Sequence, residues 1–84
     1  MDNYMITFRS VTPAQRGESL LQRIGISCSL QRTPRWMETQ GCGYSLNIKN
    51  KEISDIVNFL RNKKVQFRKV YRKLEDGSVE EIRL

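Results

Sequence analysis

The chain has 84 residues and a net charge of +6, with 15 Lys and Arg, 9 Asp and Glu, and no His. This length predicts a single domain, residues 1–84, with a thin core and no deep substrate cavity. Without His, the sequence excludes His-based acid–base catalysis and zinc sites that mix Cys with His, so we expect neither a metal nor a cofactor.

Cysteine content and targeting signals suggest where the protein resides. Cys28 and Cys42 are too few for a disulfide framework. No apolar run approaches the roughly 20 residues of a membrane span. The start, Met1–Tyr4, lacks the charged leader and apolar segment of a signal peptide. We therefore expect a cytoplasmic protein that does not bind membranes. Its basic charge is typical either of a solvated surface or of a protein with an anionic partner.

The chain begins with a predicted strand and helix. Tyr4–Phe8 alternates in the manner of a strand and is apolar on much of both faces, as expected for a central strand. The sequence Thr12-Pro13-Ala14-Gln15 predicts a helix start with Thr12 as the N-cap, and Ser10 is the alternative cap. An apolar stripe at helical spacing follows: Ala14, Gly17, Leu21 and Ile24. Gly25 is the expected stop.

Two further strands flank a long loop. Ile26–Leu30 alternates cleanly, and Cys28 falls on its inward face as a small core residue. Tyr44–Ile48 is the next predicted strand. The loop between them is too long for a tight hairpin, and such loops are more often functional than decorative.

The last third predicts a helix and a hairpin. Asn50 is a plausible cap for a helix with a strong apolar stripe. The stripe consists of Ile53, Ile56, Val57 and Leu60. A strand is expected over Val65–Leu74, with a register change before Val70. Asp76-Gly77 then predicts a tight turn into a final strand over Val79–Leu84.

The order strand–helix–strand–strand–helix–strand predicts the α+β class. We expect a ferredoxin-like βαββαβ sandwich, with two helices on one face of an antiparallel sheet and an extra C-terminal strand. In this topology the long loop lies where the first strand leaves for the first helix and where the second helix leads into the fourth strand. Cys42 should therefore lie near the N-terminus of the first helix.

The loop Thr33–Gly43 contains residues that a small fold does not require. It holds the only Trp, Trp36, and it places Cys42 between Gly41 and Gly43. The glycines remove steric cover, which favours an accessible thiol, and they allow positive φ, which can direct backbone amide hydrogens toward an anion. A helix N-terminus and nearby cations favour the thiolate. The surrounding residues expected near the thiol are Arg9, Ser10, Arg32, Arg35, Lys63 and Lys64. The alternative is a plain turn with an idle thiol.

These residues resemble the small bacterial family described as selenium/sulfur carrier protein-like. The similarity covers about residues 4–72 and leaves 73–84 as a C-terminal extension. The matching pieces are Tyr4–Phe8 with Ser10, Glu18 with Leu21, Gly25-Ile26, Thr33-Pro34-Arg35 and Gly41-Cys42-Gly43. Gln40 and Tyr44 depart from the family pattern.

The resemblance implies that Cys42 holds sulfur or selenium, as a persulfide or selenylsulfide, and passes it from a donor enzyme to an acceptor protein. It implies a carrier rather than a turnover enzyme. In this role Arg35 would stabilise the anion and Pro34 would stiffen the loop. Trp36 would offer a docking surface, together with Lys63 and Lys64, although Trp36 fits a partly buried position equally well.

A non-catalytic basic module that binds single-stranded nucleic acid or an acidic protein is the alternative function. Ferredoxin-like sheets bind RNA through exposed aromatic side chains. Tyr44–Ile48 supplies one aromatic residue and no cation, which disfavours RNA. A regulatory domain that dimerises through its sheet is a third reading. The sequence leaves open the cargo, the donor, the acceptor and the oligomeric state, including a homodimer.

Overall fold

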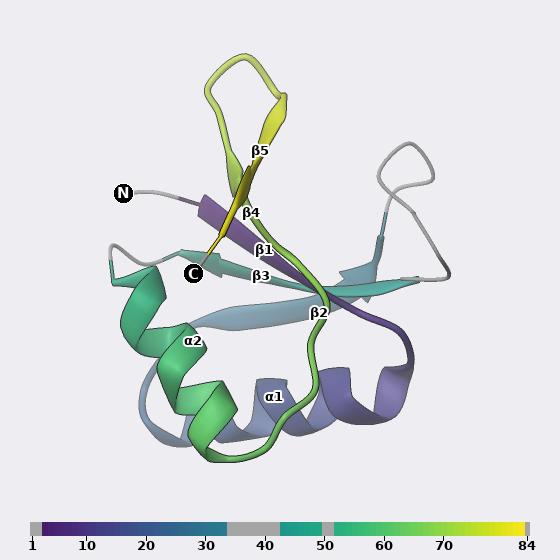
Figure 1. Ribbon diagram of the computed structural model, residues 1–84, viewed down its shortest axis with the longest axis vertical. Coiled ribbons are helices and arrows are strands. Elements are labelled where there is room, and N and C mark those ends of the chain that lie inside the picture. Colours follow the sequence, from purple (N-terminus) through teal and green to yellow (C-terminus); the bar gives the residue numbers. More distant parts are fainter. Residues whose placement is uncertain (1–2, 34–42, 50–51, 84) are drawn as a thin grey trace.

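The computed structural model describes residues 3–33, 43–49 and 52–83. The elements in chain order are Asn3–Phe8 (β1), Val11–Arg23 (α1), Cys28–Arg32 (β2), Tyr44–Lys49 (β3), Ile53–Asn62 (α2), Val70–Lys73 (β4) and Val79–Ile82 (β5). The strands form one five-stranded sheet in the order β2-β3-β1-β4-β5, and every neighbouring pair is antiparallel. Both helices lie on the same face of this sheet (Figure 1).

The predicted α+β class is confirmed. The first four strands have the order expected for a βαββαβ sandwich, with β1 central between β3 and β4. The sheet is not strictly ferredoxin-like, because β5 adds a fifth strand beside β4. The C-terminal hairpin that the Asp76-Gly77 sequence predicts is therefore present, and its turn lies on the side of the sheet away from the helices (Figure 1).

Alternating residues of the sheet pack against the helices. Tyr4, Ile6 and Phe8 of β1 are all buried in the core. The α2 stripe is buried as its spacing predicts: Ile53, Ile56, Val57 and Leu60. Gly17 lets α1 approach the sheet closely, because a β-carbon at this position would lie 3.3 Å from Leu46 Cδ1.

The start of α1 differs from the first prediction. Ser10, the alternative cap, occupies the N-cap position, so that Val11 is the first helical residue and Pro13 the third. Pro is tolerated there because first-turn amides have no intrahelical partner. The Pro also removes an amide that an N-cap side chain commonly binds. The Ser10 side chain makes no capping hydrogen bond.

The end of α1 explains why β2 begins later than predicted. The helix stops before Gly25, which has the positive φ of 83° expected at a helix end. The amide of Ile26 donates to the carbonyl oxygen of Leu21 at 3.0 Å, so it closes the helix instead of joining the sheet. The ladder therefore starts at Cys28. Ile24, predicted to belong to the buried stripe, is 52% exposed.

The segment after α2 also differs from the predicted long strand. The amide of Val65 closes α2 by donating to Leu60 O at 3.0 Å. Further on, the Lys69 amide donates to the side-chain oxygen of Thr7 at 3.1 Å, which interrupts regular pairing. The ladder of β4 therefore begins only at Val70, where the register change was predicted. At the other end of α2 the N-cap position is Glu52, and Asn50 lies outside the described residues.

Candidate functional site

The residues that flank the Cys42 loop, Arg32 and Thr33 before it and Gly43 and Tyr44 after it, lie at one end of the sheet. Tyr44 pairs with Phe8, the last residue of β1, and with Arg32, the last residue of β2. The amide of Thr33 donates a 3.0 Å hydrogen bond to the carbonyl oxygen of Gly43, which closes the base of the loop. Because α1 begins directly after β1, this base lies at the end of the sheet that the topology predicts.

Most predicted residues of the loop lie outside the described residues: Pro34, Arg35, Trp36, Gly41 and Cys42. Gly43 is described. A β-carbon at Gly43 would meet none of the described residues within 4 Å. Among the described glycines, Gly25 and Gly77 have a positive φ.

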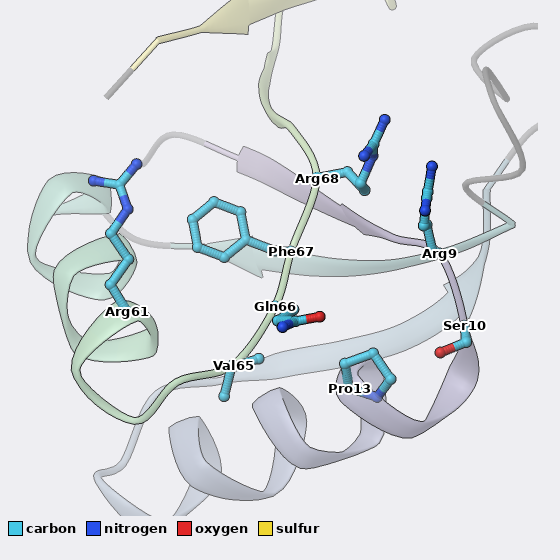
Figure 2. Close-up of a pocket in the computed structure, with 8 residues that line it drawn as sticks. All are labelled: Arg9, Ser10, Pro13, Arg61, Val65, Gln66, Phe67 and Arg68. Atoms are coloured by element: carbon cyan, nitrogen blue, oxygen red, sulfur yellow. The ribbon is translucent and has the colours of Figure 1, made fainter.

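A hollow of about 650 Å³ lies beside the start of α1. We call it the arginine hollow. Its lining residues are Arg9, Ser10, Pro13, Arg61, Val65, Gln66, Phe67 and Arg68. Three of these eight residues are arginines and none is acidic. The side chains of Arg9 and Arg68 extend side by side in the same direction, and Gln66, Ser10 and Pro13 lie below them (Figure 2).

Long-range pairing brings the arginines together. Arg9 directly follows β1. The amide of Arg68 donates to the carbonyl oxygen of Thr7 at 2.8 Å, so the segment leading into β4 runs alongside the end of β1. Arg61 comes from the last turn of α2, and its guanidinium lies over the ring of Phe67 at 5.6 Å from the ring centre.

The helix terminus adds positive potential to the arginine hollow. A helix N-terminus carries roughly half a unit of positive charge, which acidic side chains in the first turn normally offset. The first turn of α1 contains no acidic residue, and the Ser10 hydroxyl does not cap it. Ser10 and Pro13 belong both to this terminus and to the hollow. The local arrangement therefore favours an anion.

The described parts of the chain contain neither a cluster of potential metal ligands nor a helix that could span a membrane. Residues 3–33, 43–49 and 52–83 contain no group of three or more Cys, Asp or Glu side chains that could hold a metal ion. None of the helices in those ranges is long and apolar enough to cross a membrane.

Comparison with protein families classifies the chain. The model of the family described as "Putative Se/S carrier protein-like" matches residues 3–72. The chain belongs to this family. No curated protein and no solved structure gives a significant match. The family match includes β1 to α2 and most of β4, whereas β5 lies beyond it.

Within this Se/S carrier-like chain, the described residues of the predicted basic set have different neighbours. Arg9 and Ser10 line the arginine hollow, and Lys64 lines an adjoining hollow that shares Ser10 with it. Arg32 lies over the ring of Tyr44, 5.6 Å from its centre. Lys63 lies over the ring of Phe59 at 5.8 Å. Arg32 and Lys63 thus each make a cation–π contact, with Tyr44 and with Phe59 respectively.

The sequence prediction named Arg9 and Ser10 as site residues and missed the other six residues that line the arginine hollow: Pro13, Arg61, Val65, Gln66, Phe67 and Arg68. Arg61 belongs to the last turn of α2, and the sequence prediction gave it no role in a site. The antiparallel pairing of the first and fourth strands in the predicted fold was the signal that could have located Arg68 near Arg9. Continuing the observed register from Ile6 and Val70 places Arg68 opposite the end of β1.

Cys28 belongs to a different part of the molecule. It pairs with Ile48, which pairs in turn with Tyr4, at the opposite end of β1 from Phe8. Its thiol is half-buried and donates to the carbonyl oxygen of Glu18 at 3.8 Å. Burial, and secondarily the Glu18 carboxylate, raise the pKa of Cys28 above its ordinary value. Both effects disfavour the thiolate, which suits the predicted structural role.

Proposed function

We propose that this protein carries sulfur or selenium on Cys42 and passes it from a donor enzyme to an acceptor protein. Family membership supports the cargo class. The observation that most directly supports the site is the pairing of Tyr44 with Phe8 and Arg32, which holds the base of the Cys42 loop beside the start of α1. Cations and a helix N-terminus favour a nucleophilic thiolate.

The transfer requires only one reactive sulfur. The Cys42 thiolate attacks the outer sulfur of a cysteine persulfide on the donor. A new sulfur–sulfur bond forms on Cys42 while the donor's sulfur–sulfur bond breaks, and the electron pair leaves on the donor thiolate. An acceptor nucleophile then takes the outer sulfur and releases the Cys42 thiolate. Selenium would follow the same steps as a selenylsulfide.

The neighbouring loop residues have supporting roles in this proposal. Arg35, with Arg9 at the loop base, would favour the anionic sulfur, and Pro34 would restrict the loop. Gly41 would leave room for the donor's sulfur to approach. The partner surface would include Trp36, Lys63 and Lys64.

A sulfur-loading experiment tests the carrier function. The Cys28→Ala variant is incubated with a cysteine desulfurase and cysteine, and its intact mass is then measured. We expect a mass gain of one sulfur atom that dithiothreitol reverses. The matched Cys42→Ser variant, which keeps Cys28, should gain none. Equal loading of both variants, or no loading of either, would contradict the proposal.

The pH dependence of alkylation provides a second measurement. In Cys28→Ala, the alkylation rate of Cys42 should reach half its maximum below the ordinary cysteine pKa of about 8.5. A midpoint at or above that value would show that the thiol is not activated in the free protein.

Single-stranded RNA binding is the less supported alternative. Phe8 and Leu46 face α1, since both lie against Gly17. Alternation along β1 and β3 then directs Met5, Thr7 and Ser45 to the helix-free face, where all three are buried. These three positions provide no aromatic ring for base stacking. Tyr71 of β4, which pairs with Met5, supplies one ring on this face but is partly buried. We therefore expect no salt-sensitive retention of a single-stranded oligonucleotide by the wild-type protein.

A further inference from the structure

We propose that the arginine hollow binds the phosphate group of a small phosphate monoester. This inference concerns a ligand that the carrier chemistry does not require: Arg9 has a role in both proposals, but none of the described residues that line the hollow is a thiol. It rests on the charge and size of the hollow and on its lining of both charged and apolar side chains. Its test is independent of the role of Cys42.

The charge of the hollow matches a phosphate. Arg9 and Arg68 are exposed and extend in parallel from adjacent segments (Figure 2). A guanidinium is planar and always charged, and it binds phosphate oxygens with two parallel hydrogen bonds. Two such groups on one rim can bind different oxygens of the same phosphate.

The start of α1 gives a third source of attraction. Ser10 lies at the edge of the hollow and is exposed, and its hydroxyl is not used for capping. It can donate to a phosphate oxygen. Pro13 supplies no amide, but the amides of the first helical residues lack partners within the helix, as in other phosphate sites at helix N-termini.

The size and the apolar lining favour a small organic ester over bare phosphate. A volume of about 650 Å³ falls within the roughly 300–1,000 Å³ of small-molecule sites. Pro13, Val65 and Phe67 supply apolar surface beside the arginines. The guanidinium of Arg61 lies over the Phe67 ring, which places a further charge next to this surface. The organic part of the ester would lie against this side of the hollow.

The test is an NMR titration of the full chain with adenosine 5′-monophosphate, using adenosine and inorganic phosphate as separate probes. We expect saturable shifts of backbone amides at Arg9 to Val11 and at Gln66 to Arg68. Adenosine should cause none, and inorganic phosphate should cause the same shifts at higher concentration. The Cys42→Ser variant should bind the monophosphate as the wild type does.

Matched variants decide whether the arginines form the site. Arg9→Gln and Arg68→Gln should each weaken binding about tenfold, the scale of one lost charge-assisted hydrogen bond. Arg23→Gln removes the same charge at the far end of α1 and should leave affinity nearly unchanged. Thermal melts of all variants check folding. If one hollow variant fails to fold, the other still supplies the comparison.

Three results would overturn the proposal. Equal weakening by Arg23→Gln and Arg68→Gln would mean nonspecific attraction to net charge. Equal binding of adenosine and its monophosphate would remove the role of the phosphate. Tighter binding of a single-stranded oligonucleotide, with the steep salt dependence of many phosphate contacts, would assign the surface to nucleic acid instead.

Discussion

Thr33 and Gly43 close the base of the Cys42 loop through a backbone hydrogen bond of 3.0 Å between the Thr33 amide and the Gly43 carbonyl oxygen. The side chain of Thr33 takes no part in this closure. Its hydroxyl oxygen is buried and has no hydrogen-bond partner among the described residues. The loop base therefore depends on main-chain geometry, while the Thr33 hydroxyl costs desolvation.

Thr33→Val should leave the free energy of unfolding unchanged or raise it by up to about 1 kcal/mol. Valine has nearly the shape of threonine and removes a buried oxygen that lacks a partner. Urea denaturation measures the change. The Thr33→Ser variant is the comparison, because it keeps the hydroxyl and removes a methyl group, and it should be less stable than the valine variant. A clear loss of stability in Thr33→Val would show that the hydroxyl has a structural partner.

Cys28 should alkylate more slowly than a free cysteine near pH 8 in the Cys42→Ser variant. Burial and Glu18 raise its pKa, so less thiolate is present at a given pH. The raised pKa also means that Cys28 contributes most to stability below its unfolded pKa. That contribution is lost as the pH rises through the higher folded value. Rates measured with iodoacetamide from pH 7 to 10 give the titration.

Glu18→Gln provides the control for the Cys28 prediction. It removes the carboxylate charge while keeping an oxygen that can accept from the Leu30 amide, which Glu18 binds at 3.0 Å. The Cys28 alkylation rate should then rise modestly, because burial is the larger cause of the shift. An unchanged or lower rate would mean that Glu18 does not influence the thiol.

Gly17→Val should destabilise the fold by about 1–3 kcal/mol, the usual cost of overpacking a core. A β-carbon at this position would lie 3.3 Å from Leu46 Cδ1 and 3.6 Å from Phe8 Cζ, and valine adds two more methyl groups. Gly43→Ala is the matched control, since a β-carbon there meets no atom of the described residues within 4 Å. It should change the stability by no more than about 0.5 kcal/mol. Equal effects in urea melts would contradict the close packing of α1.

Leu60→Ala should destabilise the protein by about 2–5 kcal/mol, because it removes a fully buried side chain of α2 and leaves a cavity. This is a large part of the roughly 5–15 kcal/mol that stabilises a typical domain. The exposed neighbour Asn58 provides the control, and Asn58→Ala should change the stability by less than about 0.5 kcal/mol. Thermal and urea unfolding followed by circular dichroism measure both variants.

Gly77→Ala should weaken the C-terminal hairpin by about 1–2 kcal/mol, because Gly77 has a φ of 89° that L-residues adopt only with strain. Hydrogen exchange of the β5 amides should become faster than in the wild type, while that of β1 changes less. Asp76 supports the same turn by accepting a 2.9 Å hydrogen bond from the Ser78 amide. Uniformly unchanged exchange in Gly77→Ala would rule out this strain.

Local sequence patterns were enough to predict most elements of the fold. The apolar residues of α2 from Ile53 to Leu60 recur at helical spacing and form one buried face, so their spacing alone indicates a helix that packs against a core. Gly25 and Gly77 mark chain reversals because each has a positive φ. The boundaries were less predictable. Ile26 closes α1, and Lys69 binds the Thr7 side chain, through hydrogen bonds that periodicity does not reveal.

By itself, the sequence determined the order of strands and helices and the faces they bury, because these follow from side-chain periodicity and turn chemistry over neighbouring residues. Only the tertiary structure decided which cations share a site. Arg9 and Arg68 are far apart in the sequence, and they meet because the chain entering β4 pairs with Thr7 beside the start of α1. Lys63, adjacent to Lys64, lies over Phe59 instead. The positions of charged residues along a chain do not reveal which of them lie close together in the fold. Their proximity depends on the register and direction of strands that long connections join.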